Sequence, residues 1–558
     1  MMRSKPQRFF SNHRADLRPR STFSIPPTSL LWPISRPPAA PSKDAAAVAW
    51  ESDLGLGELA QYFSSDRRYL PFIRSLLAAL TTDPQVIAWR QAVLADFVAN
   101  PIMAEKIDGL LGRFVDLRQG NALFGQRRKN LLLETSDRLA ELELYVAIVQ
   151  DLYAALQEAH LQSPALTKVY DDLAMLLADE NFQSLQAELP DLRAPLENIR
   201  SLTIGINLDM QLQPASAVLL AINPQQIGES VSLLDRLIGT RAEDTEETGI
   251  APLHVLPKNP DERPFSPLFQ DLDRLMTQIA QPIARALTKY VRTSSAAVAG
   301  LEDELAFYGA ALKLMKRMGE RGVAFCQPEI APIDECVTQI EGLVNINLAL
   351  RSNDKPVPNP VEFGVEGRIA LLTGPNSGGK TTYLQSVGLA QAMFQAGLFI
   401  PAKAARLSPI DAILTHFPQL ETRQQGRLAE EASRLRTLFS VATGHSLILL
   451  NETFSSTSSG EALYLAQDIL CGLRVIGVRA IFATHLVELV GRIDEIEAVA
   501  AGESRLFSLV AGVRLIGEAQ AVPTYQITRG QPLGKSYAQE IARRHGISLE
   551  QILATRNS

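Results

Sequence analysis

Cysteine is scarce in this sequence, which holds only Cys326, Cys336 and Cys471 among its 558 residues. None of the three has the close spacing or the histidine neighbours of a zinc site, so we interpret them as ordinary buried thiols. So few cysteines suit a reducing compartment, and we expect a cytoplasmic protein. Long apolar runs are also missing, because none approaches the roughly 20 residues of a membrane-spanning helix. The sequence therefore excludes a membrane-embedded subunit.

The chain is longer than one hydrophobic core usually organises, and its length predicts roughly three domains. Its apolar content of 46% and its charged content of 21% are ordinary for a soluble globular protein. The formal net charge is −7, so the overall charge does not indicate nucleic-acid binding. Any contact with DNA must come from a local positive patch.

Residues 1–45 differ from the rest in composition. They contain eight prolines and carry a net charge of +6, which leaves −13 for the remaining chain. Because such a segment cannot bury a core, we predict that it is disordered. An organelle transit peptide is an alternative, although the prolines interrupt any amphipathic helix. This basic tail is one candidate for the positive patch.

Residues 46–325 show mainly helical periodicity. Asp83 and Pro84 predict the cap and first turn of a helix that ends at Asn100, and apolar residues then recur every three to four positions. Near residues 200–225 the apolar residues alternate instead, with Pro214 in a predicted turn, which indicates an inserted β-hairpin. Residues 240–263 are acidic and proline-containing, which predicts a solvated loop, and helices then resume to about Gly322.

Residues 326–535 alternate between strand and helix patterns. The predicted strands are Ile369 to Thr373, Ser446 to Leu450 and Arg479 to Ala483. This order predicts an α/β sheet whose ligand site lies at the carboxyl ends of the strands. The fold class is thus a mostly helical region with a small inserted β element, followed by a C-terminal α/β domain.

A glycine-rich phosphate loop follows the first of these strands. Its spacing places a lysine and a threonine directly after a glycine, with a predicted helix from Thr381 to about Gln395 behind them. Backbone N–H groups of such a loop surround the phosphates of ATP, while Lys380 offsets charge and the Thr381 hydroxyl reaches Mg²⁺. A plain glycine turn is the alternative to this complete motif. The candidate ATP-binding residues are Gly374, Pro375, Asn376, Ser377, Gly378, Gly379, Lys380, Thr381 and Thr382.

Polar residues also end the other two predicted strands. Glu452 is positioned to act as general base toward the attacking water, and Asn451 to hold Mg²⁺ through a water molecule. Asn451 lacks the usual aspartate charge, so slow hydrolysis is expected. His485 follows the third strand, where an imidazole can sense a γ-phosphate; a lone histidine at this place is more often structural.

These motifs together resemble the MutS family within the ABC ATPase superfamily. The resemblance covers about residues 355–553. The helical region upstream also resembles the family, but that match is less specific. It implies an ABC-type ATPase domain over residues 326–535, a core and lever region with a clamp-like insertion over 46–325, and a helical dimerisation segment over 536–558. The matching stretches are Gly374 to Tyr383, Gly397 to Ala402, Pro409 to Asp411, Phe482 to His485 with Glu488 and Leu489, and Lys535 to Ala538 with Ile541, Ala542, Gly546 and Ile547.

Several positions depart from the family pattern. Asn451 replaces the aspartate that precedes the catalytic glutamate, and residues 454–459 replace a glycine-rich segment. The stretch that would contact the partner's γ-phosphate aligns with Gly426 to Glu431, where a glycine replaces the usual serine. From the sequence we expect neither the family's mismatch-reading domain before the helical region nor a nuclease module after residue 558. Mismatch repair proper is therefore not expected.

The sequence predicts a MutS-like ATPase that forms a homodimer through its ATPase domains and closes around double-stranded or branched DNA when ATP binds. One alternative is a nucleotide-switched DNA-binding protein with negligible hydrolysis, because of Asn451. A second is an ABC-type ATPase of another complex, against which the altered signature stretch and the absence of heptad arms argue.

Overall fold

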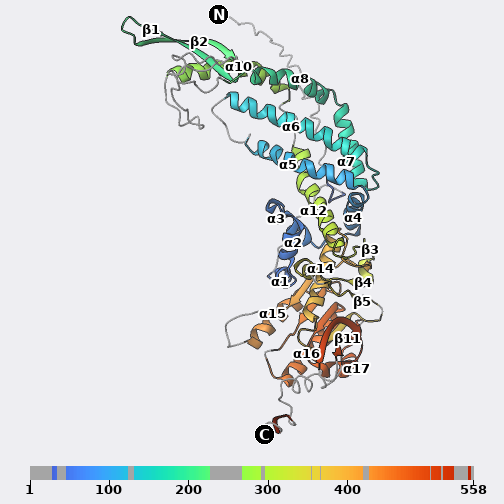
Figure 1. Ribbon diagram of the computed structural model, residues 1–558. Coiled ribbons are helices and arrows are strands. Elements are labelled where there is room, and N and C mark those ends of the chain that lie inside the picture. Colours follow the sequence, from blue (N-terminus) through green and yellow to red (C-terminus); the bar gives the residue numbers. More distant parts are fainter. Residues whose placement is uncertain are drawn as a thin grey trace, which may run out of the picture. The chain divides into compact units, whose positions relative to one another are not determined.

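The computed structural model forms two compact units (Figure 1). The first includes Gly112–Asp151 and Asp172–Ala299, and the second includes Thr28–Leu111, Leu152–Asp171 and Gly300–Ser558. The structure describes residues 28–33, 45–123, 131–226, 267–290, 296–352, 355–364, 366–418, 427–455, 457–502, 504–516, 520–532 and 551–553. The predicted loop at 240–263, Gly426 and nearly all of the predicted dimerisation segment lie outside these residues.

The first unit is mainly helical, as its apolar periodicity predicts. Tyr145 packs edge-on against Phe182, with ring centroids 5.9 Å apart. The boundary between the two units falls within three of the helices, α5, α6 and α7. The elements that lie wholly or partly in the first unit are α5 (Pro101–Leu123), α6 (Leu131–Gln157), α7 (Pro164–Ala178), α8 (Glu180–Glu197), β1 (Ser201–Leu208), β2 (Pro214–Asn223), α10 (Pro267–Leu287), η3 (Thr288–Tyr290) and α11 (Ala296–Ala299).

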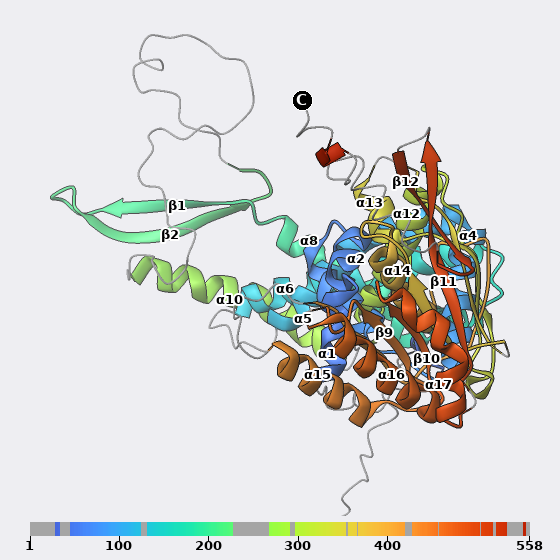
Figure 2. The ribbon, with the colours of Figure 1, turned by 90° about the horizontal axis from the view of Figure 1, so that it is seen from below.

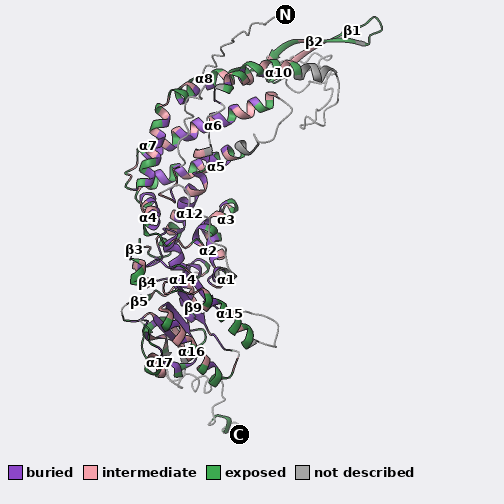
Figure 3. Ribbon diagram, turned by 180° about the vertical axis from the view of Figure 1, so that it is seen from behind, coloured by how far each residue is buried: buried purple, intermediate pink, exposed green. Residues whose placement is uncertain are grey.

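Strands β1 and β2 form the predicted antiparallel hairpin. The predicted turn position of Pro214 is wrong, because this residue opens β2 and pairs with Leu208. A proline is tolerated at the first residue of a strand, where its missing N–H interrupts no ladder. Most hairpin residues are exposed or only partly buried (Figure 3).

The second unit combines helices from both ends of the described chain with two sheets. Its helices are α1 (Ala45–Asp53), α2 (Leu56–Phe63), η1 (Arg67–Tyr69), α3 (Leu70–Leu77), α4 (Pro84–Ala99), α12 (Glu302–Gly319), η4 (Ile333–Glu335), α13 (Ile346–Arg351), α14 (Lys380–Gln395), α15 (Arg427–Val441), α16 (Ser459–Ile476), η5 (Val487–Arg492) and α17 (Ile493–Val499). Its strands are β3 (Glu329–Ile330), β4 (Thr338–Leu343), β5 (Asn359–Phe363), β6 (Ile369–Thr373), β7 (Ala404–Leu407), β8 (Ile413–His416), β9 (Leu447–Asn451), β10 (Arg479–Ala483), β11 (Leu506–Ile516) and β12 (Gln520–Arg529).

The larger sheet has the strand order β12-β11-β6-β10-β9-β8 and is parallel except for β12. Strands β6, β8, β9 and β10 are buried throughout, which explains why most of their residues are apolar or small. Helices α15, α16 and α17 cover one face, and α14 lies on the other (Figure 2). Residues of η5 pack on the first face as well. The predicted strands at β6 and β10 are confirmed, and β9 lies one residue later than predicted.

The smaller sheet has the order β3-β7-β4-β5, with only the β3-β7 pair parallel.

Of the cysteines, Cys336 is buried, but Cys326 and Cys471 are only partly buried, so the prediction of three buried thiols is wrong for two of them. No helix in the described part of the chain has both the length and the apolar character to cross a membrane.

The predicted disorder of residues 1–45 is wrong for residues 28–33. Leu30 and Leu31 are 0% and 2% exposed. The Glu304 carboxylate of α12 accepts hydrogen bonds from Ser29 Oγ at 2.7 Å and from the Leu30 amide at 2.6 Å. Arg90 of α4 donates to the Leu31 carbonyl at 3.1 Å. The prediction failed here because it used the average composition of the tail, which does not show this short apolar stretch. Burial of its side chains offsets the conformational entropy lost when the stretch becomes ordered.

Candidate nucleotide site

The phosphate loop joins the carboxyl end of β6 to the first residue of α14. Gly374 and Gly379 have φ values of 137° and 90°, which L-residues with side chains rarely adopt. A Cβ on Gly378 would lie 2.9 Å from the Pro375 carbonyl oxygen, too close for a side chain. Glycine is thus required at these positions, and the loop ends at the N-terminus of α14, where an anion can bind.

Lys380 is the first residue of α14, and its side chain is only 4% exposed. Its ammonium group donates to the carbonyl oxygens of Gly374 at 3.0 Å and of Pro375 at 3.1 Å, and lies 3.6 Å from the Glu452 carboxylate. Burial lowers the pKa of Lys380, while the Glu452 carboxylate acts in the opposite direction. A buried ammonium that relies on two carbonyls and one carboxylate gains further stabilisation from a phosphate.

Asn451 ends β9 beside the phosphate loop. Its side-chain oxygen accepts a hydrogen bond from Thr381 Oγ1 at 3.2 Å, and Asn451 is 6% exposed. Hydroxyl and amide oxygens are among the ligands that Mg²⁺ accepts, alone or through water. The two side chains therefore fit a magnesium ion that also contacts bound phosphates.

Glu452 lies in the tight turn that follows β9. Its φ is 48°, and its amide donates to the Ala483 carbonyl of β10 at 2.8 Å. The side chain is 32% exposed and lines the same cavity as Lys380 and Thr381. A partly exposed carboxylate next to the phosphate loop is placed to accept a proton from water.

His485 lies one strand further along the sheet. It follows β10, whose Ala483 pairs with Asn451 of β9, and it is exposed. His485 is not among the described residues that line the cavity with Lys380, Thr381 and Glu452. The structure thus brings together the other predicted residues, and a role for His485 stays a prediction.

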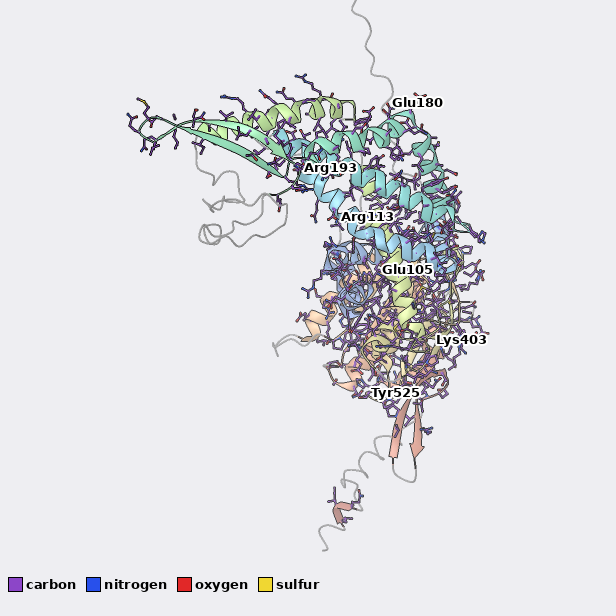
Figure 4. All side chains as sticks on the ribbon, turned by 45° about the horizontal axis from the view of Figure 1, so that its top comes forward. Glu105, Arg113, Glu180, Arg193, Lys403 and Tyr525 are labelled. Atoms are coloured by element: carbon purple, nitrogen blue, oxygen red, sulfur yellow. The ribbon has the colours of Figure 1, made fainter. Side chains whose placement is uncertain are left out.

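A cavity of about 430 Å³ adjoins the phosphate loop, and part of its lining was missed by sequence reasoning. Asn345 caps α13 and donates to the Thr382 carbonyl at 2.9 Å. Tyr525 of β12, labelled in Figure 4, lies against Gly379, since a Cβ on Gly379 would be 3.4 Å from the Tyr525 ring. Asn359 holds the backbone around Tyr525 by bonds to the Tyr525 carbonyl at 3.0 Å and the Ile527 amide at 2.7 Å. Lys355 also lines the cavity.

Of these lining residues, only Asn345 carries a local sequence signal, because asparagine is a typical capping residue before a helix. Tyr525 and Asn359 carry no local motif. Tyr525 meets the loop because β12 belongs to the same sheet as β6, and Asn359 is joined to β12 by side-chain hydrogen bonds.

Comparison with known proteins gives matches in both halves of the chain. Residues 82–321 match the MutS2 N-terminal domain, and residues 370–557 match MutS domain V. Endonuclease MutS2 of Thermomicrobium roseum is 29% identical over 520 residues, which cover 86% of this chain and 61% of that protein. Endonuclease MutS2 of Thermus thermophilus is 37% identical over 190 residues, 34% of this chain and 24% of that protein.

DNA mismatch repair protein MutS of Brevibacillus brevis is 35% identical over 184 residues, which cover 32% of this chain and 21% of that protein. The chain therefore spans less than two thirds of the length of these relatives.

Proposed function

Because this chain belongs to the MutS family, we propose that it is an ATP-dependent DNA-binding protein that hydrolyses ATP. It binds ATP with Mg²⁺ at the phosphate loop and acts on DNA structures in repair or recombination. The observation that carries the proposal is that Lys380, Thr381 and Glu452 line one cavity and that Asn451 is hydrogen-bonded to Thr381 beside it. These residues come from two separate strand ends of the larger sheet.

In this proposal, each of the four side chains has one role. Lys380 exchanges its bonds to the loop carbonyls for bonds to phosphate oxygens. Thr381 and Asn451 hold Mg²⁺, which supplies neutralisation of phosphate charge when it is bound. Glu452 accepts a proton from the attacking water. Release of Glu452 from Lys380 on phosphate binding frees its carboxylate for that step.

The domain boundaries that we propose are a core and lever region over 46–325, an ATPase domain over 326–535 and a dimerisation segment over 536–558. A homodimer through the ATPase domains then completes each nucleotide site. Strands β1 and β2 contain no lysine, arginine or histidine. The hairpin therefore offers no cation to DNA phosphates, and we propose that other basic segments, including the N-terminal tail, supply them.

A DNA-stimulated ATPase assay tests this function. We expect Mg²⁺-dependent turnover that branched duplex stimulates more than plain duplex or a single mismatch, because branched DNA offers more phosphates to a dimer. Competition binding at fixed salt provides the control. Preference for the mismatch, or no DNA binding in any nucleotide state, would contradict the proposal.

A second candidate is a nucleotide-switched DNA-binding protein with negligible hydrolysis. The neutral Asn451 amide beside Thr381 favours it, because a carboxylate at that place would bind Mg²⁺ more strongly. ATP binding without measurable turnover, with DNA affinity that changes between ATP and ADP, would support this candidate.

A further inference from the structure

We propose that His416 and Glu431 are positioning residues that hold the Glu452 turn in the geometry needed for hydrolysis. Neither belongs to the phosphate loop or to the strand end that bears Glu452. The inference rests on the proposed function, since it assigns a role in the reaction of the same site.

The Glu452 turn has an unfavourable backbone that needs support from its surroundings. Both Glu452 and Phe454 have positive φ values, 48° and 65°. Such values are uncommon for residues with side chains and persist only where neighbouring groups fix them. One support comes from β10, through the bond from the Glu452 amide to the Ala483 carbonyl. A second is within the turn, where the Ser455 amide donates to the Glu452 carbonyl at 3.2 Å. Two further supports come from the side opposite β10, from β8 and α15.

His416 supplies the support from β8. It is the last residue of that strand, pairs in parallel with Leu450 of β9 and is 3% exposed. Its Nδ1 lies 3.1 Å from Thr453 Oγ1, directly after Glu452 in the chain. Its Nε2 has no hydrogen-bond partner among the described residues, so the bond to Thr453 is the one that the ring makes there.

The charge state of the ring fits this role. Burial, together with the nearby Arg434 guanidinium, lowers the pKa of His416 to about 4. The imidazole is therefore neutral near pH 7, and its Nδ1 can share a single proton with the Thr453 hydroxyl. A neutral ring also adds no charge that would compete with Lys380 for Glu452.

Glu431 supplies the support from α15. Its Oε2 accepts a hydrogen bond from the Phe454 amide at 3.0 Å. That amide belongs to the second residue of the turn with positive φ. Glu431 lies in the second turn of α15, so the position of this helix and the conformation of the Glu452 turn are linked by one side chain.

A purely structural role for His416 is the competing explanation, since buried histidines often only fill a core. The two explanations differ in what a variant changes. Loss of core packing lowers stability and affects ATP binding and turnover together. Loss of turn positioning lowers kcat while ATP affinity stays the same, because the phosphate loop is held by other contacts.

The experiment uses the full-length chain with paired variants at each position. Thr453→Val removes the hydroxyl at nearly constant volume, and Thr453→Ser keeps it. His416→Leu removes the ring nitrogen, and His416→Asn keeps a polar atom near the Nδ1 position. Glu431→Ala removes the acceptor, and Glu431→Gln keeps an oxygen. Thr437→Val on α15 is the matched control, since the Thr437 hydroxyl donates to the Ser433 carbonyl within its own helix.

We expect Thr453→Val, His416→Leu and Glu431→Ala to lower kcat by roughly 10- to 100-fold with ATP affinity within about twofold of the parent. The conservative variants should recover most of the rate. The double variant His416→Leu with Thr453→Val should lose no more than the worse single variant, because both remove one bond. Full activity in Thr453→Val, or equal losses in kcat and ATP affinity, would overturn the proposal.

A second measurement does not depend on turnover. Hydrogen exchange of the peptide that contains residues 451–455 should become faster in the three disruptive variants, while β10 stays protected. Unchanged exchange would overturn the positioning role. If the parent binds ATP without turnover, hydrolysis as the proposed function fails, and the exchange result still decides the role of His416 and Glu431.

Discussion

The Thr381 hydroxyl donates a hydrogen bond to the side-chain oxygen of Asn451 at 3.2 Å, and this bond joins α14 to the end of β9. Asn451 is a neutral amide, whereas the sequence resemblance implies a carboxylate at this position. The site that we propose for Mg²⁺ therefore has one negative charge fewer than that resemblance implies. In our proposal, this difference decides between an ATPase and a nucleotide switch.

Asn451→Asp should strengthen Mg²⁺ binding and raise turnover. A charged partner adds about 1.5 kcal/mol to a contact, which corresponds to a roughly tenfold lower Mg²⁺ requirement. Titration of ATPase activity with Mg²⁺ measures this. Asn181→Asp, at an exposed position in α8, serves as the control. An unchanged Mg²⁺ curve would show that Asn451 does not contact the metal.

Lys380→Ala should weaken ATP binding by roughly 10- to 100-fold, because it removes a charge-assisted contact of about 1.5–3 kcal/mol. Calorimetric titration with ATP provides the measurement. Lys403→Ala is the control, since Lys403 is 67% exposed on another part of the same unit (Figure 4). Parent-like affinity in the Lys380 variant would remove the basis for the ATP site.

Glu452→Gln should keep ATP binding and lose hydrolysis by at least about 100-fold, because an amide cannot accept the proton of water. Single-turnover measurements with bound ATP separate this effect from product release. Turnover equal to the parent would move the base role to another residue, with His485 as the next to test.

Leu31→Ala should lower the free energy of unfolding of the second unit by about 2–5 kcal/mol, because it leaves a cavity in a close-packed core. Urea denaturation followed by tryptophan fluorescence measures it, and Val475→Ala, 66% exposed on α16, is the control. Deletion of residues 1–33 should destabilise the unit as well. A loss below about 0.5 kcal/mol would contradict the packing of this segment.

Deletion of residues 1–27 should reduce the salt dependence of DNA binding. This part of the tail holds six basic residues against Asp16 and stops short of the buried Leu30. Each lost phosphate contact lowers the slope of log affinity against log salt by about 0.9. Binding isotherms between low and moderate salt give the slope. A slope equal to that of the parent would assign the DNA contacts to the remaining chain.

Much of the nucleotide site was predictable because its chemistry is local in sequence. The glycines, Lys380 and Thr381 stand within one loop, and their backbone conformations follow from neighbouring residues. The apolar runs of β6 and β10 likewise predicted buried parallel strands at the correct residues. Pro214 was misplaced because a proline fits both a turn and the first position of a strand.

The sequence by itself determined the strand, loop and helix of the phosphate site, since glycine and proline geometry and apolar periodicity act over a few residues. Only the tertiary structure decided which distant groups meet there. Sheet pairing brings Tyr525 against Gly379 and Asn451 beside Thr381, and it places His416 next to Thr453. Burial of residues 28–33 was decided in the same way, because a short apolar stretch gains its stability from the core that receives it rather than from its own conformation.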